Sequence, residues 1–343
     1  MNNSAKSSST SPDVGEIAPV IFAEINKAKS VLLCCHPFPD PDSVGSNLAM
    51  KFALESLGKK VTVIQGDTNV PLAYMHFPGA DSIVKKNLFE INFKDYDLFI
   101  SLDSPQDQLS KIKPIDFPLP IRSISIDHHS SGKTFADINL VINEAPATAE
   151  IIYKLLNEWK IVITPEIAAN IFVATYFDTL FLKLPSVTPE TFSMMSALSI
   201  KINNRANLLS RVESSETPET LLLYGKAFSS VTTFLNGNLA ISRLSYDDLV
   251  ECGMDKISKS TNFVSNFMKM VYGWKIVVAI MEIEPGYVKC SLRSNDVINY
   301  PIDQIAMTLG GGGHKGAAGI KLKTTPEEAA RLIVEKTKAL YNL

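Results

Sequence analysis

Short apolar runs alternate with amphipathic segments in the first half of the chain. The apolar runs have the length of buried strands and cover residues 30–35, 60–65, 97–102 and 122–126. The amphipathic segments have apolar residues at helical spacing and cover residues 43–58, 148–159, 165–177 and 188–200. Strands that alternate with helices predict an α/β domain that has a parallel sheet with helices on both faces.

The pattern changes in the second half of the chain. Asn236-Gly237 and Pro285-Gly286 each separate two strand-like runs, which is typical of β-hairpins, and helical stretches lie at 256–271 and 326–341. This pattern predicts a smaller α/β domain with a mixed sheet. The expected division is a disordered tail at 1–16, the parallel-sheet domain at 17–201, a polar linker at 202–227 and the smaller domain at 228–343.

Carboxylates and imidazoles follow three of the predicted strands and one predicted helix. These residues are His36, Asp40, Asp42, Asp103, Asp127, His128, His129 and Asp178. The carboxyl ends of parallel strands line one crevice at the edge of a sheet. We therefore expect these side chains to converge, although the chain separates them widely.

The chemistry of these side chains favours a divalent metal site. The set contains carboxylate and imidazole but no thiolate, which suits Mn²⁺ better than a structural zinc ion. The candidate ligands are His36, Asp40, Asp42, Asp103, His128 and Asp178. They exceed what one ion needs if it keeps open positions, whereas two ions about 3.5–4 Å apart would use them all. Two Mn²⁺ ions that activate a water for attack on a phosphoester are thus predicted.

A glycine-rich segment, LGGGGHKGAAG at 309–319, is a second candidate site. Consecutive glycines let backbone N–H groups approach an anion closely. We expect substrate to bind at Gly311, Gly312, Gly313 and His314. Arg293, at the end of a predicted strand, is a candidate for bidentate phosphate recognition.

Each of these features also has a structural interpretation. An Asp-His-His triplet alone is more often an exposed turn, and an Asp-x-Asp before a helix is often only an N-cap. A glycine run is more often a flexible loop than a phosphate site. The combination favours function, because chance must otherwise explain three strand-end sites in order together with the glycine-histidine segment.

Charge and cysteine content narrow the range of partners and compartments. The net charge of −3 excludes a uniformly basic surface, so duplex DNA is a poor candidate partner. The cysteines Cys34, Cys35, Cys252 and Cys290 lie in apolar stretches and favour reduced thiols in the cytoplasm. No apolar run reaches the roughly 18 residues that span a bilayer, and the polar N-terminus does not resemble a signal peptide.

The ordered motifs resemble those of the DHH phosphoesterases with a C-terminal DHH-associated domain. The resemblance is to the type that includes nanoRNases, phosphoadenosine-phosphate phosphatases and cyclic-di-AMP phosphodiesterases, and it covers the chain from about residue 17 onward. The matching motifs are HPFPDPDSVGS from His36, LDSPQ around Asp103, IDHHSSG around His128, FDT at Asp178 and GGGGHKGAAG in the second domain.

The resemblance implies a role for each residue. His36, Asp40 and Asp103 would bind one Mn²⁺, and Asp42, Asp103, His128 and Asp178 would bind the other, so that Asp103 bridges. His129 would contact the scissile phosphate as an acid, with Asp127 orienting an imidazole. Arg293, His314 and the glycines would hold the far end of the substrate. Related proteins are often dimers, but the sequence identifies no homodimer face.

Two positions depart from the family pattern. The fourth motif usually reads Asp-Thr-Gly with a later Arg, whereas this chain has Leu180 in place of the glycine and Lys183 near the expected arginine. Pro41 replaces a common glycine in the opening loop, which makes that loop stiffer. The ligands are kept, so the expected function is hydrolysis of short RNA or small nucleotides. A nucleotide sensor with little turnover is the alternative, and a pyrophosphatase is a weaker one.

Overall fold

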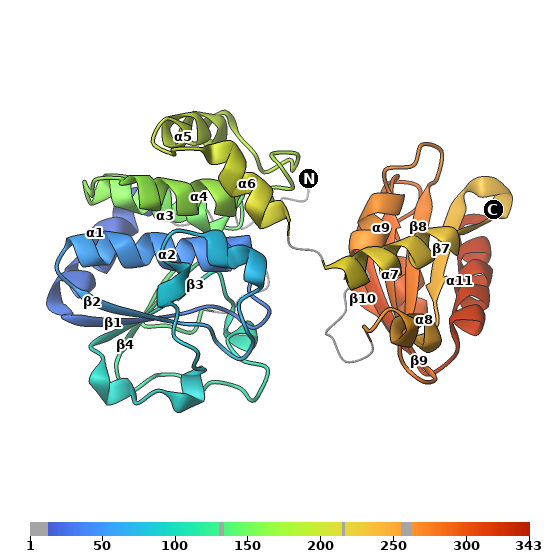
Figure 1. Cartoon of the computed structure of the whole chain (residues 1–343), viewed down its shortest axis with the longest axis horizontal. Helices are drawn as coiled ribbons and strands as arrows, with labels where there is room; N and C mark the ends of the chain where they lie inside the picture. Colours follow the sequence, from blue (N-terminus) through green and yellow to red (C-terminus); the bar gives the residue numbers. More distant parts are fainter. Residues whose placement is uncertain (1–12, 130–133, 215–216, 255–261) are drawn as a thin grey trace, which may run out of the picture. The chain divides into compact units, whose positions relative to one another are not determined.

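The computed structural model describes residues 13–129, 134–214, 217–254 and 262–343. The chain divides into two compact units, Met1–Ser215 and Glu216–Leu343 (Figure 1). The first unit contains a parallel sheet and the second a mixed sheet, each with helices packed against it. The predicted fold class is therefore confirmed.

A five-stranded parallel sheet forms the centre of the first unit, in the order β2-β1-β3-β4-β5. The strands are β1 (Ser30–Cys34), β2 (Lys60–Ile64), β3 (Leu98–Leu102), β4 (Arg122–Asp127) and β5 (Ile138–Val141). The first four match the predicted strands, whereas β5 is a short, half-exposed edge strand with a weak apolar signal. The strand order reverses between β1 and β3, and such a switch point opens a crevice at the carboxyl ends of the strands.

The two faces of this sheet are covered by helices of different kinds. α-Helices pack on the face that carries Val31 and Leu33, and the opposite face, with Leu32 and Phe99, packs against 3-10 helices and loops. The α-helices of this unit are α1 (Val14–Lys27), α2 (Pro41–Ser56), α3 (Thr148–Glu158), α4 (Pro165–Asp178), α5 (Pro189–Ser199) and α6 (Arg205–Glu213). The 3-10 helices are η1 (Leu72–His76), η2 (Ala80–Ser82), η3 (Leu88–Glu90), η4 (Phe93–Asp95) and η5 (Gln106–Gln108).

Helices α2 and α4 pack closely, and a glycine permits this. A Cβ atom added to Gly45 in α2 would lie 2.6 Å from the carbonyl oxygen of Asn170 and 2.8 Å from Cβ of Ala174, both in α4. The first turn of α2 carries Asp42, and α4 ends at Asp178. The close packing therefore fixes the separation of two of the predicted metal ligands.

A six-stranded mixed sheet forms the centre of the second unit, in the order β10-β11-β9-β8-β7-β6. Only β7 and β8 pair in parallel. The strands are β6 (Thr232–Phe234), β7 (Leu239–Leu244), β8 (Ile276–Glu284), β9 (Tyr287–Ser294), β10 (Gly312–His314) and β11 (Ala317–Leu322). The helices are α7 (Pro218–Ser229), η6 (Leu235–Gly237), α8 (Tyr246–Glu251), α9 (Asn262–Met268), α10 (Asp303–Thr308) and α11 (Pro326–Tyr341).

Both predicted hairpins are present in this sheet. Asn236 and Gly237 have positive φ between antiparallel β6 and β7, and Gly286 has φ +73° between antiparallel β8 and β9. Helices α10 and α11 cover the face that carries Val278, whereas α7, α8 and α9 cover the face that carries Val277. The second unit therefore has a hydrophobic core on each side of its sheet.

Several segments differ from the predicted boundaries. Helix α1 begins at Val14, so residues 14–16 are helical, and residues 1–12 of the predicted tail lie outside the described residues. The predicted linker at 202–227 contains α6 and most of α7. Within the helix predicted at 256–271, α9 covers Asn262–Met268, and 256–261 lie outside the described residues. Among the helices described here, none combines the length and the apolar character that crossing a membrane requires.

We predict that Gly45→Ala destabilises the first unit by about 1–3 kcal/mol, because the new methyl group overpacks the α2–α4 contact. It should also weaken Mn²⁺ binding, since Asp42 and Asp178 are carried by these two helices. The matched control is Gly225→Ala in α7, where an added Cβ meets nothing within 4 Å. Urea denaturation and Mn²⁺ titration test both variants, and an unchanged Gly45→Ala protein would contradict the packing argument.

Candidate metal centre

The candidate ligands lie at the carboxyl ends of the strands, around the switch point. The loop after β1 carries His36, Asp40 caps the N-terminus of α2, and Asp103 directly follows β3. The pair His128 and His129 follows β4, on the other side of β3. The structure thus brings together groups that are far apart in the sequence, as expected from a parallel sheet.

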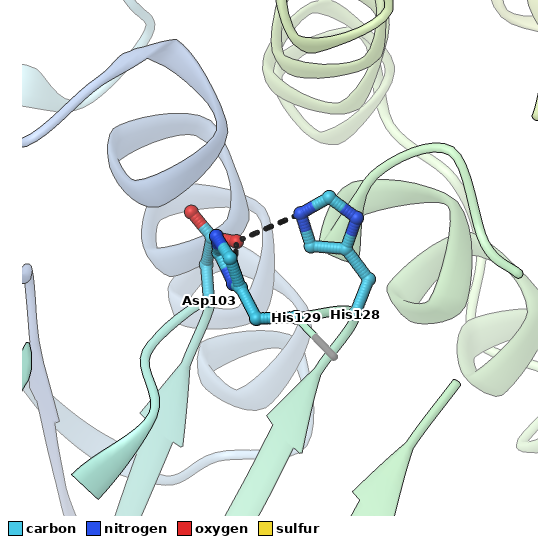
Figure 2. Close-up of side chains that lie close together, drawn as sticks. All are labelled: Asp103, His128 and His129. Carbon is cyan, nitrogen blue, oxygen red and sulfur yellow. Dashed lines mark ion pairs between the residues drawn. The ribbon is translucent and has the colours of Figure 1, made fainter. Parts of the chain in front are cut away.

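These side chains form two groups that meet at the carboxylate of Asp103. Its Oδ2 atom lies 3.6 Å from Nε2 of His36, and that nitrogen lies 3.7 Å from Oδ1 of Asp40. Its Oδ1 atom lies 3.5 Å from Nε2 of His128, as the dashed line in Figure 2 shows. The same nitrogen lies 4.0 Å from Asp42 Oδ2 and 3.5 Å from Asp178 Oδ2. Each oxygen of Asp103 therefore faces a different group.

The separations within each group match ligands around a common ion. Donor atoms that each lie about 2.1 Å from one ion are roughly 3.0–3.6 Å apart. The groups His36–Asp40–Asp103 and Asp42–His128–Asp178 each offer one ligand atom per residue, all within 4.8 Å of one another. Among the described residues, Oδ2 of Asp103 has no hydrogen-bond partner although it is buried. A cation beside it would satisfy this atom, so the residues fit a divalent metal.

Backbone carbonyls orient the two histidine ligands. Nδ1 of His36 lies 3.0 Å from the carbonyl oxygen of Pro37, and Nδ1 of His128 lies 3.2 Å from that of Ala145. A carbonyl only accepts, so each Nδ1 carries a proton, and in the neutral form of each ring Nε2 presents its lone pair. That is the tautomer that metal coordination by Nε2 requires.

The N-terminus of α3 holds Asp42. Its carboxylate accepts hydrogen bonds from the backbone N–H groups of Thr148 and Ala149 and from the hydroxyl of Ser46. The Thr148 hydroxyl also donates to Oδ1 of Asp103 at 3.0 Å. The first turn of a helix carries partial positive charge, so α3 partly compensates two neighbouring carboxylates. Thr148 was not predicted from the sequence, because its role depends on contacts with Asp42 and Asp103, both distant in the chain.

Crowded carboxylates raise one another's pKa. Burial, together with Asp42 and Asp40, raises the pKa of Asp103 well above its ordinary value. Burial and the same two neighbours raise the pKa of Asp178 to about 8. For His36, burial alone would lower the pKa, but its pairing with Asp103 and Asp40 raises the pKa to about 11. Without a metal this buried space therefore retains protons, which a divalent cation would displace on binding.

His129 has a different environment from His36 and His128. Its Nδ1 donates to Oδ1 of Asp127 at 2.8 Å, and the same oxygen accepts from the backbone N–H groups of His128 and His129. The hydrogen bond to Asp127 raises the pKa of His129, which favours the protonated imidazolium. Nδ1 of His129 also lies 3.8 Å from Oδ1 of Asp103, beside the metal groups. An Asp–His pair at this place can hold a proton for transfer.

Two family models match the chain. The N-terminal domain of the DHH family matches residues 30–175, and the DHHA1 domain matches residues 237–342. The chain belongs to the DHH family. Its relatives include an oligoribonuclease and PAP phosphatase, and this protein is a DHH-family phosphoesterase.

Curated relatives align with this DHH enzyme over most of the chain or over about half of it. The bifunctional oligoribonuclease and PAP phosphatase NrnA of Thermus thermophilus is 27% identical over 88% of this chain and 88% of its own length. A probable protein of the same description from Streptococcus mutans is 25% identical over 87% and 91%. A probable manganese-dependent inorganic pyrophosphatase of Lactobacillus helveticus is 27% identical, but over only 49% of this chain and 53% of its own.

A solved structure shares the fold. The crystal structure of an exopolyphosphatase-related protein from Bacteroides fragilis superposes with a TM-score of 0.81, covers 96% of this chain and 98% of its own, and is 23% identical. The likeness therefore extends through both units of the DHH enzyme.

The fourth DHH motif adopts a strained turn after α4. Leu180, Phe181 and Leu182 have φ values of +50°, +64° and +63°, in the left-handed region that favours glycine. This explains the glycine of the family pattern at position 180. Hydrogen bonds hold the turn: the N–H of Leu180 donates to Phe177 and that of Phe181 to Tyr176. Lys183 places Nζ 5.6 Å from the centre of the Phe181 ring.

The DHHA1 domain aligns Arg293 and His314 across its sheet. His314 pairs with Ala317, and Ala317 pairs with Arg293, so these side chains share one face. The guanidinium of Arg293 donates to Asn266, Ser291 and the carbonyl of Leu292. These hydrogen bonds fix the orientation of the Arg293 side chain.

The glycines of this domain have two different roles. A Cβ atom on Gly311 would lie 2.2 Å from the carbonyl oxygen of Gly319, and one on Gly313 would lie 2.5 Å from that of Ala317. Close packing of the β10–β11 hairpin therefore requires these two glycines, whereas Gly312 has open space. Anion binding, the role predicted from the sequence for Gly311, Gly312 and Gly313, therefore leaves out the structural role of Gly311 and Gly313.

We predict that Asp103→Asn abolishes binding of a pair of Mn²⁺ ions, because both groups lose a ligand charge. In EDTA the same variant should be more stable, by on the order of 1 kcal/mol or about 2–4 °C in Tm, because a buried and repelled carboxyl is removed. Calorimetric Mn²⁺ titration and thermal unfolding measure the two effects.

Asp97→Asn at the other end of β3 is the matched control. The carboxylate of Asp97 accepts from the N–H groups of Lys29 and Ser30, so this variant should lower Tm and leave Mn²⁺ binding intact. Two-ion binding by Asp103→Asn, or a lower Tm of that variant in EDTA, would contradict the bridging role.

Proposed function

We propose that this DHH-family phosphoesterase uses two Mn²⁺ ions to hydrolyse short oligonucleotides or small nucleotides, such as nanoRNA, phosphoadenosine phosphate and linear or cyclic di-AMP. The observation that carries the proposal is the carboxylate of Asp103, whose two oxygens face two separate ligand groups. The names of the relatives support the substrate class and the metal: an oligoribonuclease and PAP phosphatase, and a manganese-dependent pyrophosphatase.

In this proposal the two groups hold one ion each. His36, Asp40 and Asp103 would hold the first, and Asp42, Asp103, His128 and Asp178 would hold the second. Bound ions of this kind supply Lewis acidity and a water with a lowered pKa. The chain itself orients His36 and His128 through Pro37 and Ala145 and holds Asp42 on α3. The ligand geometry is therefore preorganised before a metal arrives.

His129 is the proposed acid. Its Nδ1–H is engaged by Asp127, so Nε2 is the atom that can hold and deliver a proton. The raised pKa of His129 favours retention of that proton. Delivered to the departing oxygen of the ester, the proton neutralises the charge that develops when the P–O bond breaks. Asp127 is a positioning residue in this scheme.

The second unit is proposed to bind the part of the nucleotide away from the cleaved bond. Arg293 and His314 lie in one row of the sheet, and Gly312 leaves its backbone open. Few cations suffice for a small anionic substrate, which agrees with the net charge of −3 and with the exclusion of duplex DNA. The four cysteines are buried free thiols, which supports a cytoplasmic location.

Two other functions use the same residues. A nucleotide sensor would keep the ligands without turnover, and the substitution at Leu180 is the feature that favours it. The pyrophosphatase relative aligns with only 49% of this chain, and the DHHA1 match over residues 237–342 argues against this function. The oligoribonuclease relatives span both units, which favours the enzyme that acts on nucleotides.

We predict Mn²⁺-dependent release of mononucleotides from dinucleotides, and loss of all activity in Asp103→Ala. The assay offers dinucleotides, phosphoadenosine phosphate, cyclic di-AMP and pyrophosphate to the purified full chain, with product analysis. Stoichiometric nucleotide binding without product would favour the sensor, and turnover of pyrophosphate alone would favour the pyrophosphatase. No metal-dependent turnover of any nucleotide ester defeats the proposal.

We predict that Asp127→Asn shifts the alkaline limb of the pH profile of kcat to lower pH. Pairing with Asp127 raises the pKa of His129, so the imidazolium is present below that pKa and is lost as the pH rises through it. Without the Asp127 carboxylate, the imidazolium of His129 loses its proton at a lower pH. Mn²⁺ affinity should change little, which separates this effect from damage to the metal site. If the alkaline limb did not shift, His129 would not be the acid.

A further inference from the structure

Two exposed phenylalanines, Phe38 and Phe181, are close in the chain to the candidate metal ligands and have strained backbone conformations. Phe38 lies two residues from both His36 and Asp40, has φ +58° and leaves 58% of its surface exposed. Phe181 lies three residues after Asp178, has φ +64° and leaves 42% exposed. Exposed single apolar side chains are ordinary. It is unusual for two exposed phenylalanines to have left-handed backbone in the two loops that carry the candidate metal ligands.

The strain at these residues is maintained by specific contacts. The N–H of Phe38 donates to the hydroxyl of Thr68 at 2.6 Å, which fixes the loop between Pro37 and Pro39. The ring of Phe181 packs against the rings of Tyr176 at 5.2 Å and Phe177 at 5.6 Å. Left-handed backbone costs about 1–2 kcal/mol at a residue with a Cβ. In proteins, strained backbone that the surrounding structure maintains occurs mostly at active sites and ligand-binding sites.

Each ring is close in the chain to a different ligand group. Two residues span at most about 7 Å, so Phe38 is close to the group of His36 and Asp40. Three residues span at most about 11 Å, so Phe181 is close to the group that contains Asp178. The two rings therefore lie near different ligand groups of the candidate metal centre.

A dinucleotide needs contacts of this kind. It has a single bridging phosphate, so the metal groups can grip only a small part of it. Most of its surface is base and sugar, and aromatic side chains bind bases by stacking without reading their sequence. Lys183, with Nζ near the Phe181 ring, adds positive charge beside that surface.

We propose that Phe38 and Phe181 are stacking residues, each holding the base of one of the two nucleotides that flank the cleaved phosphate. This rests on the proposed function and deepens it, because it makes the nucleobases part of what the site recognises. It also separates the substrate class from inorganic pyrophosphate, which has no base to stack.

The test compares a dinucleotide with its abasic counterparts, in which one base at a time is replaced by hydrogen. Phe38→Ala and Phe181→Ala should each lower kcat/KM for the intact dinucleotide by about 5- to 100-fold. Each variant should lower kcat/KM less than 2-fold for the abasic substrate that lacks the base its ring holds. Phe38→Trp and Phe181→Trp should restore most of the activity, because an aromatic ring is kept.

Phe192→Ala is the matched control. Phe192 lies in α5, is 55% exposed and is not part of a metal group, so its loss should leave both substrates unaffected. Mn²⁺ affinity of the two stacking variants should equal that of the unaltered protein, which excludes collapse of the metal loops. Equal losses on intact and abasic substrates, or no loss on either, would overturn the proposal.

A binding measurement keeps the test independent of turnover. A phosphorothioate-linked dinucleotide that contains the fluorescent base 2-aminopurine should be quenched when it binds with Mn²⁺, because the base stacks on a ring. Phe38→Ala or Phe181→Ala should remove the quenching, with the base placed on the corresponding side. Quenching by a protein without hydrolytic activity would contradict the proposed hydrolysis and support stacking. Binding without quenching to an active protein would contradict stacking and leave the proposed hydrolysis in place.

Discussion

Mutual repulsion among buried carboxylates is the constraint on which the first unit depends. Asp42 and Asp103 are almost fully buried, with Asp40 and Asp178 beside them, and burial with this crowding raises the pKa of Asp103 and Asp178. Uncompensated buried charge is costly, so such a cluster persists only with strong compensation. The N-terminus of α3 supplies part of it to Asp42. Bound divalent cations would supply the remaining positive charge that compensates these carboxylates.

The fold is arranged around this cluster. The strand order β2-β1-β3-β4-β5 places the loops after β1 and β3 on either side of the switch point. Gly45 lets α2 and α4 approach, which brings Asp42 towards Asp178. Carbonyl groups of Pro37 and Ala145 set the histidine tautomers. Backbone features with no chemistry of their own therefore determine the ligand geometry, and a small packing change can affect the metal site.

The sequence predicted best what depends on local pattern and strand order. Buried strands β1 to β4 and the convergence of His36, Asp103 and His128 follow from apolar runs and from parallel topology. Contacts made by backbone atoms were out of reach, such as the amide of Thr148 on Asp42, because 106 residues separate them. The hairpin role of Gly311 and Gly313 was missed for a different reason, since only the pairing of the two strands reveals the close contact.

The central claim is that Asp103 bridges two ions. Anomalous X-ray diffraction from crystals of the full chain grown with Mn²⁺ tests it directly. The account predicts two anomalous peaks about 3.5–4 Å apart, one on the His36 side of Asp103 and the other on the His128 side. A single peak, or manganese bound away from Asp103, would contradict it.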